Sequence, residues 1–375
     1  MENSISYESI IKILTSSLSI RNPVLDYESE YMRIYKEIRD NIAAREYIII
    51  NRNNKVEISK IFQSIEKMHN VIQSCIAKYM CGNITKANVY FNNQWKKANI
   101  ITYNELYRSH LFYRMRSKKE GEQNFEAPDL LHIPLNKRDL IKNQRFSING
   151  FPCLYLSTSL YQCWEELRRP NLQNLYATGI MFTEDLKLFD LRLIRKIKTT
   201  KQLEAFLQRL PLILACSIKV KDDKGIFIPE YIISQSVLHT IIDKTNGIDG
   251  ILYSSMRKDY DYYNADGNIM DYDRNENIVI PAKLVVENNG EKKDLRDNLL
   301  RMIEIGEPRN FEQELIKGEI GYVKSKSYKK TIFGQMESLI KEGKTFCPLN
   351  NSNLKYSWGK GFSERLSSHN KINLL

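Results

Sequence analysis

Long hydrophobic runs are missing from this 375-residue sequence. Its most apolar stretch, residues 210–218, is about half as long as the roughly 20 residues that span a bilayer, and Pro211 interrupts it. The N-terminal residues include acidic side chains and lack the basic-then-apolar order of a secretion signal. We therefore expect a protein of the cytoplasm that does not contact a membrane.

Metal-binding and glycine-rich motifs are also missing. The six cysteines form no CxxC pair and the five histidines no HxxxH pair, which disfavours a zinc site and a disulfide framework. The phosphate-binding patterns GxGxxG and GxxxxGK and the nucleophile pattern GxSxG do not occur in a suitable place. In the acidic stretch 259–273 and beyond, Glu276 and Ala282 stand where a calcium loop needs glycine and glutamate. We predict no protein-bound metal.

Acidic residues are fewer than basic ones. The sequence has 45 Asp and Glu and 56 Lys and Arg, which gives a net charge of +11. The excess is spread along the chain: residues 1–100 carry +4, residues 101–290 carry +2 and residues 291–375 carry +5. Nucleic-acid-binding domains gather their basic residues on one face or one segment. The spread charge therefore disfavours nucleic acid as a partner, although it suits a phosphate-bearing small ligand.

The composition is that of a folded protein, with 42% hydrophobic and 27% charged residues, and the length predicts about two domains. Apolar side chains recur at helical spacing over residues 5–82, which predicts an N-terminal helical domain, 1–106. Residues 107–290 alternate short strands with helices. Residues 291–375 are a basic, partly helical C-terminal extension. Short strands with interspersed helices predict the α+β class.

Within the middle segment, turn residues separate short apolar runs. These runs predict strands at 111–115, 153–156, 178–182, 186–190 and 251–253, and helices at 160–167, 200–217 and 231–244. Two further runs, 279–280 and 282–287, close the region.

Polar side chains suited to a nucleotide lie in or near these strands. They are Arg114, Arg145, Tyr155, Glu165 or Glu166, and Ser254 or Ser255. Arginine forks bind phosphate oxygens, an aromatic face stacks on a planar ring, and a carboxylate stabilises positive charge on a ribose. By residue type alone, each also fits an ordinary place on a surface or in a core. The residues by themselves therefore support only an α+β domain with a phosphate site.

The order of these residues is more informative than any one of them. The passage QRFSINGFPCLYLSTSLYQCWEEL (144–167), preceded by LFYRMR (111–116) and followed by IDGILYSSMR (248–257), resembles the RES domain family. The family is named for its Arg, Glu and Ser, and the resemblance covers residues 107–290. It implies an ADP-ribosyltransferase-like split β-sheet core that binds NAD+ as substrate, without a metal.

The resemblance also implies roles for individual residues. Arg114 and Arg145 match the family's arginines and would hold the pyrophosphate of NAD+, while Tyr155 would stack on nicotinamide. Glu166, rather than Glu165, matches the glutamate that stabilises the oxocarbenium-like transition state. Ser255 would hold the ribose or orient Glu166, so Arg114, Glu166 and Ser255 form the expected catalytic set. Gln144, Ser147 and Ser254 depart from the family's usual Gly, Asn and Pro.

The implied function is cleavage of the nicotinamide–ribose bond of NAD+ by hydrolysis or phosphorolysis, as in a bacterial toxin or defence effector. An Xre-type antitoxin or another inhibitory partner is the implied protein partner, and a homo-oligomer is also open. One alternative is a mono-ADP-ribosyltransferase that modifies a protein. Another is a non-catalytic module on a RES scaffold that binds a partner or nucleic acid.

Overall fold

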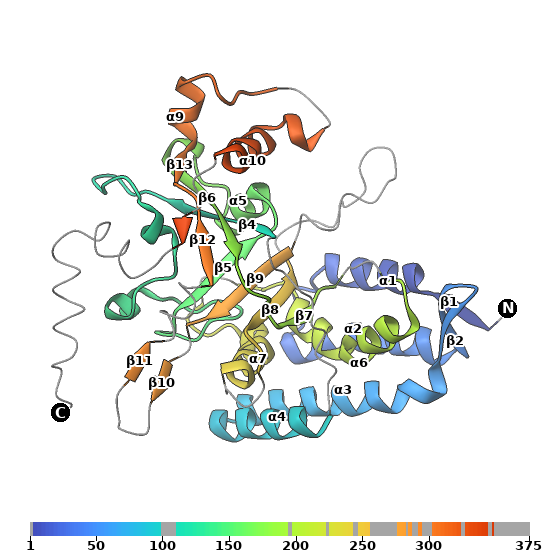
Figure 1. Cartoon of the computed structure of the whole chain (residues 1–375). Helices are drawn as coiled ribbons and strands as arrows, with labels where there is room; N and C mark the ends of the chain where they lie inside the picture. The colour runs from blue at the N-terminus through green and yellow to red at the C-terminus, as the bar shows by residue number, and fades with distance from the viewer. Residues whose placement is uncertain are drawn as a thin grey trace, which may run out of the picture. The chain divides into compact units, whose positions relative to one another are not determined.

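A computed structural model describes residues 3–98, 110–193, 197–222, 225–242, 247–255, 276–282, 284–286, 292–294, 302–323, 327–343 and 347–348 (Figure 1). The acidic stretch 259–273 and the tail beyond residue 348 lie outside the described residues. The chain divides into two compact units, each built from several stretches. Unit 1 holds Met1–Glu105, Asp139–Phe151 and Lys187–Val279, and unit 2 holds Leu106–Arg138, Pro152–Leu186 and Ile280–Leu375.

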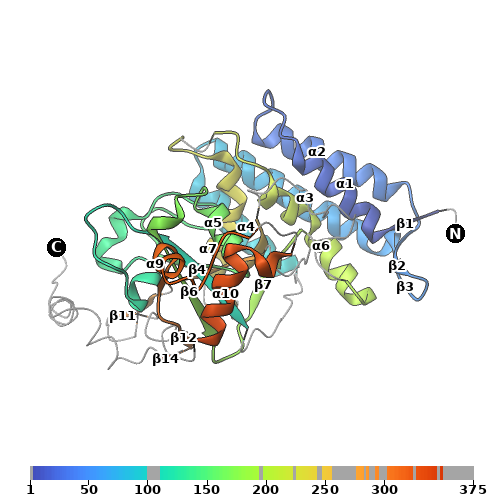
Figure 2. The same ribbon diagram turned by 90° about the horizontal axis from the view of Figure 1, so that it is seen from above.

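Helices dominate unit 1. They are α1 (Tyr7–Ser19), α2 (Tyr27–Ala43), α3 (Ile58–Met80), α4 (Ile84–Ala98), α6 (Thr200–Ser217) and α7 (Ile232–Ile242). The long helix α3 packs against α4 and α6, while α1 lies beside α2 (Figure 2). The apolar residues that recur at helical spacing in the sequence lie on one buried face of α3, which includes Ile61, Ile65 and Ile72. Gly82, at φ +79°, follows α3 in the left-handed conformation that glycine adopts without strain, and the helix ends there.

Unit 1 also contains a small sheet that the sequence analysis missed. Strand β1 (Ser4–Ser6) runs parallel to β2 (Tyr47–Asn51), and β2 pairs antiparallel with β3 (Asn54–Glu57). The prediction of helix throughout residues 5–82 is therefore wrong here. Three consecutive isoleucines follow Tyr47, and such β-branched residues favour an extended chain.

A second set of paired strands in unit 1 lies within the predicted middle segment. Strand β7 (Leu188–Leu191) runs parallel to β8 (Gly250–Ser254), and β8 pairs antiparallel with β9 (Glu276–Pro281), with Ser254 opposite Glu276. Helix α6 has the predicted bounds, because Thr199 and Gln202 form a reciprocal capping box at its start.

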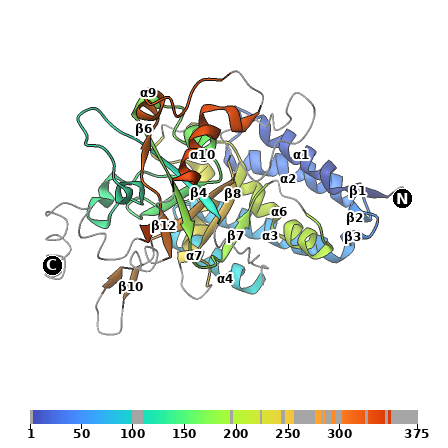
Figure 3. The same ribbon diagram turned by 45° about the horizontal axis from the view of Figure 1, so that its top comes forward.

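Unit 2 is built on antiparallel strands in the order β14-β12-β6-β4-β5. Figure 3 shows β12, β6 and β4 of this set. Their bounds are Cys347–Pro348 (β14), Ile303–Ile305 (β12), Leu175–Phe182 (β6), Leu111–Ser117 (β4) and Cys153–Ser157 (β5). The short β13 (Arg309–Asn310) also pairs with β6, and β10 (Leu284–Val286) pairs with β11 (Lys292–Asp294). The predicted strands in this unit are confirmed.

The described part of unit 2 also contains the helices α5 (Leu160–Glu166), α9 (Phe311–Ile316) and α10 (Ile332–Glu342). Helices α9 and α10 agree with the expected partly helical extension over residues 291–375, whereas the strands β12 and β13 in it were not predicted. In β12, Ile303 and Ile305 are buried and Glu304 is not, an alternation with the period of a strand.

Among the described residues, short 3-10 helices occur at Ala127–Leu130, Leu135–Leu140, Leu172–Asn174, Pro229–Tyr231 and Tyr328–Lys330. The mixture of helices and sheets confirms the α+β class. Over the described ranges, no helix is both long and apolar enough to cross a bilayer. Nor do the described residues include a group of three or more His, Cys, Asp or Glu side chains placed to hold a metal ion.

Candidate active site

Arg114 is a half-buried cation bound to backbone oxygens. From the middle of β4, its Nη1 donates to the carbonyl of Tyr155 at 2.7 Å and its Nη2 to the carbonyl of Leu131 at 3.2 Å. Its Nε is buried and meets no acceptor among the described residues. Burial lowers the pKa of Arg114 to about 10, because the charged form has lost its hydration. The described part of the chain offers this cation no carboxylate within ion-pair distance, so it can accept an anionic ligand.

Tyr155 lies next to Arg114 because β5 pairs with β4. Its neighbours Leu154 and Leu156 are buried, whereas Tyr155 keeps part of its side chain exposed. The alternation of a strand therefore points Tyr155 away from the face that the two leucines bury. A partly exposed aromatic ring beside a half-buried arginine is suited to stacking on a planar group.

Glu165 and Glu166 are the last two residues of α5, which begins at the N-cap Ser159. The helix packs on β4, where the thiol of Cys163 reaches the carbonyl of Tyr113 at 3.3 Å. Glu166 is half-buried, and its Oε1 accepts a hydrogen bond from Nε2 of the fully buried Gln162 at 3.2 Å. Glu166 is thus partly accessible and held in place, as a group that acts on a ligand must be.

Glu165 has a different environment. Its side chain is buried and its Oε2 forms an ion pair with Nε of Arg169 at 3.0 Å. Arg168 and Arg169 have φ values of 68° and 54°, a left-handed conformation that costs about 1–3 kcal/mol for a residue other than glycine. The Glu165–Arg169 pair and a hydrogen bond from Trp164 Nε1 to the carbonyl of Pro170 at 2.8 Å hold this turn. Glu165 therefore has a structural partner at the end of α5.

Arg145 belongs to unit 1, where it binds the end of α6. Its Nη1 and Nη2 donate to the carbonyls of Cys216 and Ile218 at 2.7 and 2.9 Å, and its guanidinium lies over the ring of Tyr231 at 5.3 Å. The last carbonyls of a helix lack partners within the helix, and a cation is favourable at this end. The structure thus gives Arg145 a structural contact that the sequence did not indicate. Its role toward phosphate remains a prediction.

Ser255 follows β8 in unit 1 and is fully buried. Next to it, Ser254 Oγ accepts the backbone N–H of Leu193 at 3.0 Å. Phe146 packs against Tyr253 with ring centroids 4.6 Å apart, which places the segment of Arg145 beside the end of β8. In unit 1 the segment of Arg145 thus lies beside the end of β8, which Ser255 follows. In unit 2 Arg114 and Tyr155 meet where β4 pairs with β5, and α5, which carries Glu166, packs on β4.

The sequence analysis missed a buried group of three charges near Ser254. Arg192 donates through Nε and Nη2 to both carboxylate oxygens of Asp190, at 3.0 and 2.9 Å, and through Nη1 to Glu276 at 2.7 Å. Each of the three residues is at most 7% exposed. The sequence Asp190-Leu191-Arg192 gave no signal for this, because Glu276 is 84 residues from Arg192 and faces Ser254 only through the β8–β9 register.

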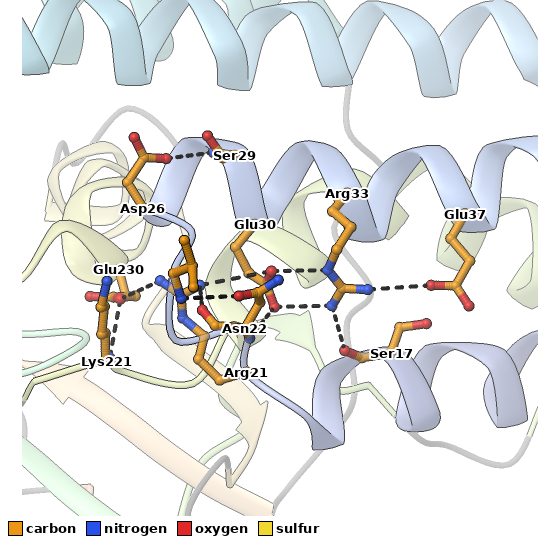
Figure 4. A network of polar contacts seen from close by, with 11 residues as sticks. Ser17, Arg21, Asn22, Asp26, Ser29, Glu30, Arg33, Glu37, Lys221 and Glu230 are labelled. Atoms are coloured by element: carbon orange, nitrogen blue, oxygen red, sulfur yellow. Dashed lines mark hydrogen bonds and ion pairs between the residues drawn. The ribbon is translucent and has the colours of Figure 1, made fainter.

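Another polar network lies outside these motifs, in unit 1 (Figure 4). The buried Glu30 accepts two hydrogen bonds from Arg33 at 3.0 Å, and Arg21 lies between Glu30 and Glu230. Burial alone would raise the pKa of Glu30, but Arg33 and Arg21 hold it below its ordinary value. These ion pairs connect the loop before α2 to the segment before α7. Each of the two carboxylates, Glu30 and Glu230, has an arginine of the network as its partner. We assign it a structural role.

Comparison with known proteins agrees with the motifs. Residues 112–277 match the family model of the RES domain, so the chain contains a RES domain and the resemblance read from its motifs is confirmed. A curated relative is the protein named "Putative toxin YopC" of Bacillus subtilis (strain 168), which is 39% identical over 145 residues. The match covers 35% of this chain and 32% of that protein, so the chain spans about a third of the relative's length. No solved structure matches the chain significantly.

Proposed function

We propose that this chain is an NAD+-degrading enzyme that cleaves the nicotinamide–ribose bond. The observation that carries the proposal is the half-buried guanidinium of Arg114, which lies in the RES domain and has backbone oxygens but no described carboxylate as partners. A desolvated cation of this kind binds a phosphate strongly, because water does not compete. The RES family acts on NAD+, whose pyrophosphate supplies such an anion.

With the pyrophosphate at Arg114, each of the other candidate residues has a role toward a further part of NAD+. Tyr155 beside Arg114 would stack on the nicotinamide ring, and Glu166 would accept a hydrogen bond from a hydroxyl of the adjacent ribose. Arg145 would contribute to the pyrophosphate site and Ser255 to the ribose site. A carboxylate at the ribose stabilises the positive charge that develops at C1′ as the bond to nicotinamide breaks.

The reaction balances without a general acid. The C1′–N bond breaks with its electron pair passing to nicotinamide, whose ring nitrogen loses its positive charge. The oxygen of water then bonds to C1′ and releases one proton to solvent, so that the products are nicotinamide and ADP-ribose. With inorganic phosphate as acceptor, the second product is phosphorylated ADP-ribose.

The biological role proposed here is that of a toxin. The name of the Bacillus subtilis relative supports it, and loss of NAD+ would stop the growth of a cell that makes the enzyme. An inhibitory partner such as an Xre-type antitoxin would then protect the producing cell.

The test compares two neighbouring carboxylates. We expect Glu166→Gln to lower the rate of NAD+ consumption by about 10²- to 10³-fold, the usual loss for one preorganised electrostatic group. The matched control is Glu165→Gln, which changes a residue paired with Arg169 and is expected to keep the rate within a few-fold. Equal rates for Glu166→Gln and the wild type would refute the assignment.

A labelled substrate identifies the acceptor. With NAD+ labelled in its adenylate part, free ADP-ribose or its phosphate supports degradation, whereas label on protein in a lysate supports ADP-ribosyl transfer. Intact NAD+ after prolonged incubation would contradict both.

A further inference from the structure

The first turn of α5, the helix that ends at Glu166, is held by a residue far downstream. Glu337 in α10 is 6% exposed, and its Oε1 accepts the backbone N–H of Leu160 at 2.8 Å. The same oxygen accepts the hydroxyl of Tyr328 at 2.5 Å. Leu160 is the first residue of α5, and the first N–H groups of a helix have no partner within it. Ser159 satisfies a second one, since its Oγ accepts the N–H of Gln162 at 3.2 Å.

Aromatic packing reinforces this contact. Phe333 of α10 packs edge-on against Tyr161 and tilted against Trp164, with centroid distances of 5.5 and 5.3 Å. Met336 and Leu160 belong to the same buried cluster. Figure 1 shows α10 beside α5 within unit 2. The side of α5 that carries Tyr161 and Trp164 thus rests on α10.

The sequence of α10 is adapted to this position. At Gly334 a Cβ atom would collide with the carbonyl of Tyr328, so only glycine lets the helix approach the 3-10 turn that carries Tyr328. That close approach places the Tyr328 hydroxyl on Glu337. Both α10 and this turn lie beyond residue 277, where the match to the RES domain ends.

A helix as short as α5, with seven residues, is not stable on its own and takes its position from its neighbours. We propose that Glu337 is a positioning residue for the catalytic carboxylate. Through Leu160 and Tyr328 it fixes α5, and α5 in turn fixes Glu166. The C-terminal part of the chain is then required for activity although it lies outside the RES match. The inference rests on the proposed function, because it concerns the placement of Glu166.

The test uses three variants of the full chain. Glu337→Ala removes the acceptor for the Leu160 N–H, and we expect kcat for NAD+ to fall at least 10-fold while KM changes less than 3-fold. Glu337→Gln keeps an oxygen acceptor and is expected to recover most of this loss. Glu342→Ala alters an exposed residue of the same helix and is expected to leave kcat unchanged. A merely structural role would lower the amount of folded enzyme and leave the kcat of that folded fraction the same.

Hydrogen exchange of the α5 peptide separates this inference from the proposed function. We expect faster exchange in Glu337→Ala than in the wild type at a temperature where circular dichroism shows both folded. Unchanged exchange, or an unchanged kcat, overturns the positioning role. If the wild type consumes no NAD+, the proposed function fails, and exchange alone decides whether Glu337 holds α5. Should Glu337→Ala not fold, Tyr328→Phe replaces it, and unchanged exchange and kcat in that variant also overturn the inference.

Discussion

Replacing Arg114 by methionine separates binding from stability at the proposed pyrophosphate site. Methionine keeps an unbranched apolar stem in β4 and removes the charge together with the hydrogen bonds to Tyr155 and Leu131. Removing the charge relieves its desolvation and raises the free energy of unfolding, whereas losing the two hydrogen bonds lowers it. For an anionic ligand, loss of the cation only weakens binding. We therefore expect a folded protein that no longer binds NAD+.

The magnitudes follow from the structure. Burial lowers the pKa of Arg114 from 12.5 to about 10, which corresponds to about 3 kcal/mol of unfavourable free energy for the charged form in the folded state. Removing the charge recovers this amount. The two lost hydrogen bonds from a charged donor contribute about 1.5–3 kcal/mol each. The net loss of unfolding free energy is then between about 0 and 3 kcal/mol.

The assay is thermal unfolding with and without NAD+, in a Glu166→Gln background so that the ligand is not consumed. At 100 times its Kd, a ligand stabilises a protein by about 2.7 kcal/mol. We expect this stabilisation in the Glu166→Gln protein and its loss when Arg114→Met is added. Arg116→Met is the matched control, because Arg116 lies two residues along the same strand, is exposed, and donates to the carbonyl of Asp129 at 2.9 Å.

Two results would refute the reasoning. Equal stabilisation by NAD+ with and without Arg114 would show that the half-buried cation is not part of the ligand site. A loss of unfolding free energy well above 3 kcal/mol would show that Arg114 is mainly a structural residue, with its desolvation fully compensated by the carbonyls.

Two further predictions concern unit 1. Arg192→Met leaves Asp190 and Glu276 buried without their cation, so we expect urea unfolding to show a loss of about 3–5 kcal/mol at pH 7.5; a loss below 1 kcal/mol would contradict the importance of this group. Burial lowers the pKa of His69, which stacks on Tyr35 at 3.7 Å. Below about pH 6.5 the unfolded chain therefore binds a proton that the folded chain does not, and stability falls on acidification by up to about 1.4 kcal/mol per pH unit. His69→Phe should reduce this slope between pH 6.5 and 5, and an identical slope in both proteins would show that other groups cause it.

Much of the candidate site could be predicted from sequence, because its signals are local. The strands of Arg114 and Tyr155 and the helix of Glu166 follow from turn residues, apolar runs and the N-cap Ser159, all of which act over a few residues. The order of the RES motifs then identified the domain. The same local reasoning failed at Tyr47–Asn51 and Ile303–Ile305, where short isoleucine-rich segments fit helix and strand patterns equally well until a pairing partner is known.

Contacts between distant parts of the chain could not be predicted. The bonds from Arg145 to the end of α6, from Arg192 to Glu276 and from Glu337 to Leu160 join residues 71, 84 and 177 positions apart. The sequence by itself determined the α+β class, most of the helices and strands, and the RES domain. Helix caps, strand alternation and motif order depend on residues that are close in the sequence. Only the tertiary structure decided which carbonyls bind Arg114 and Arg145 and which helix supports α5, the helix of Glu166. These contacts join residues that are far apart in the sequence, so they depend on how the whole chain folds.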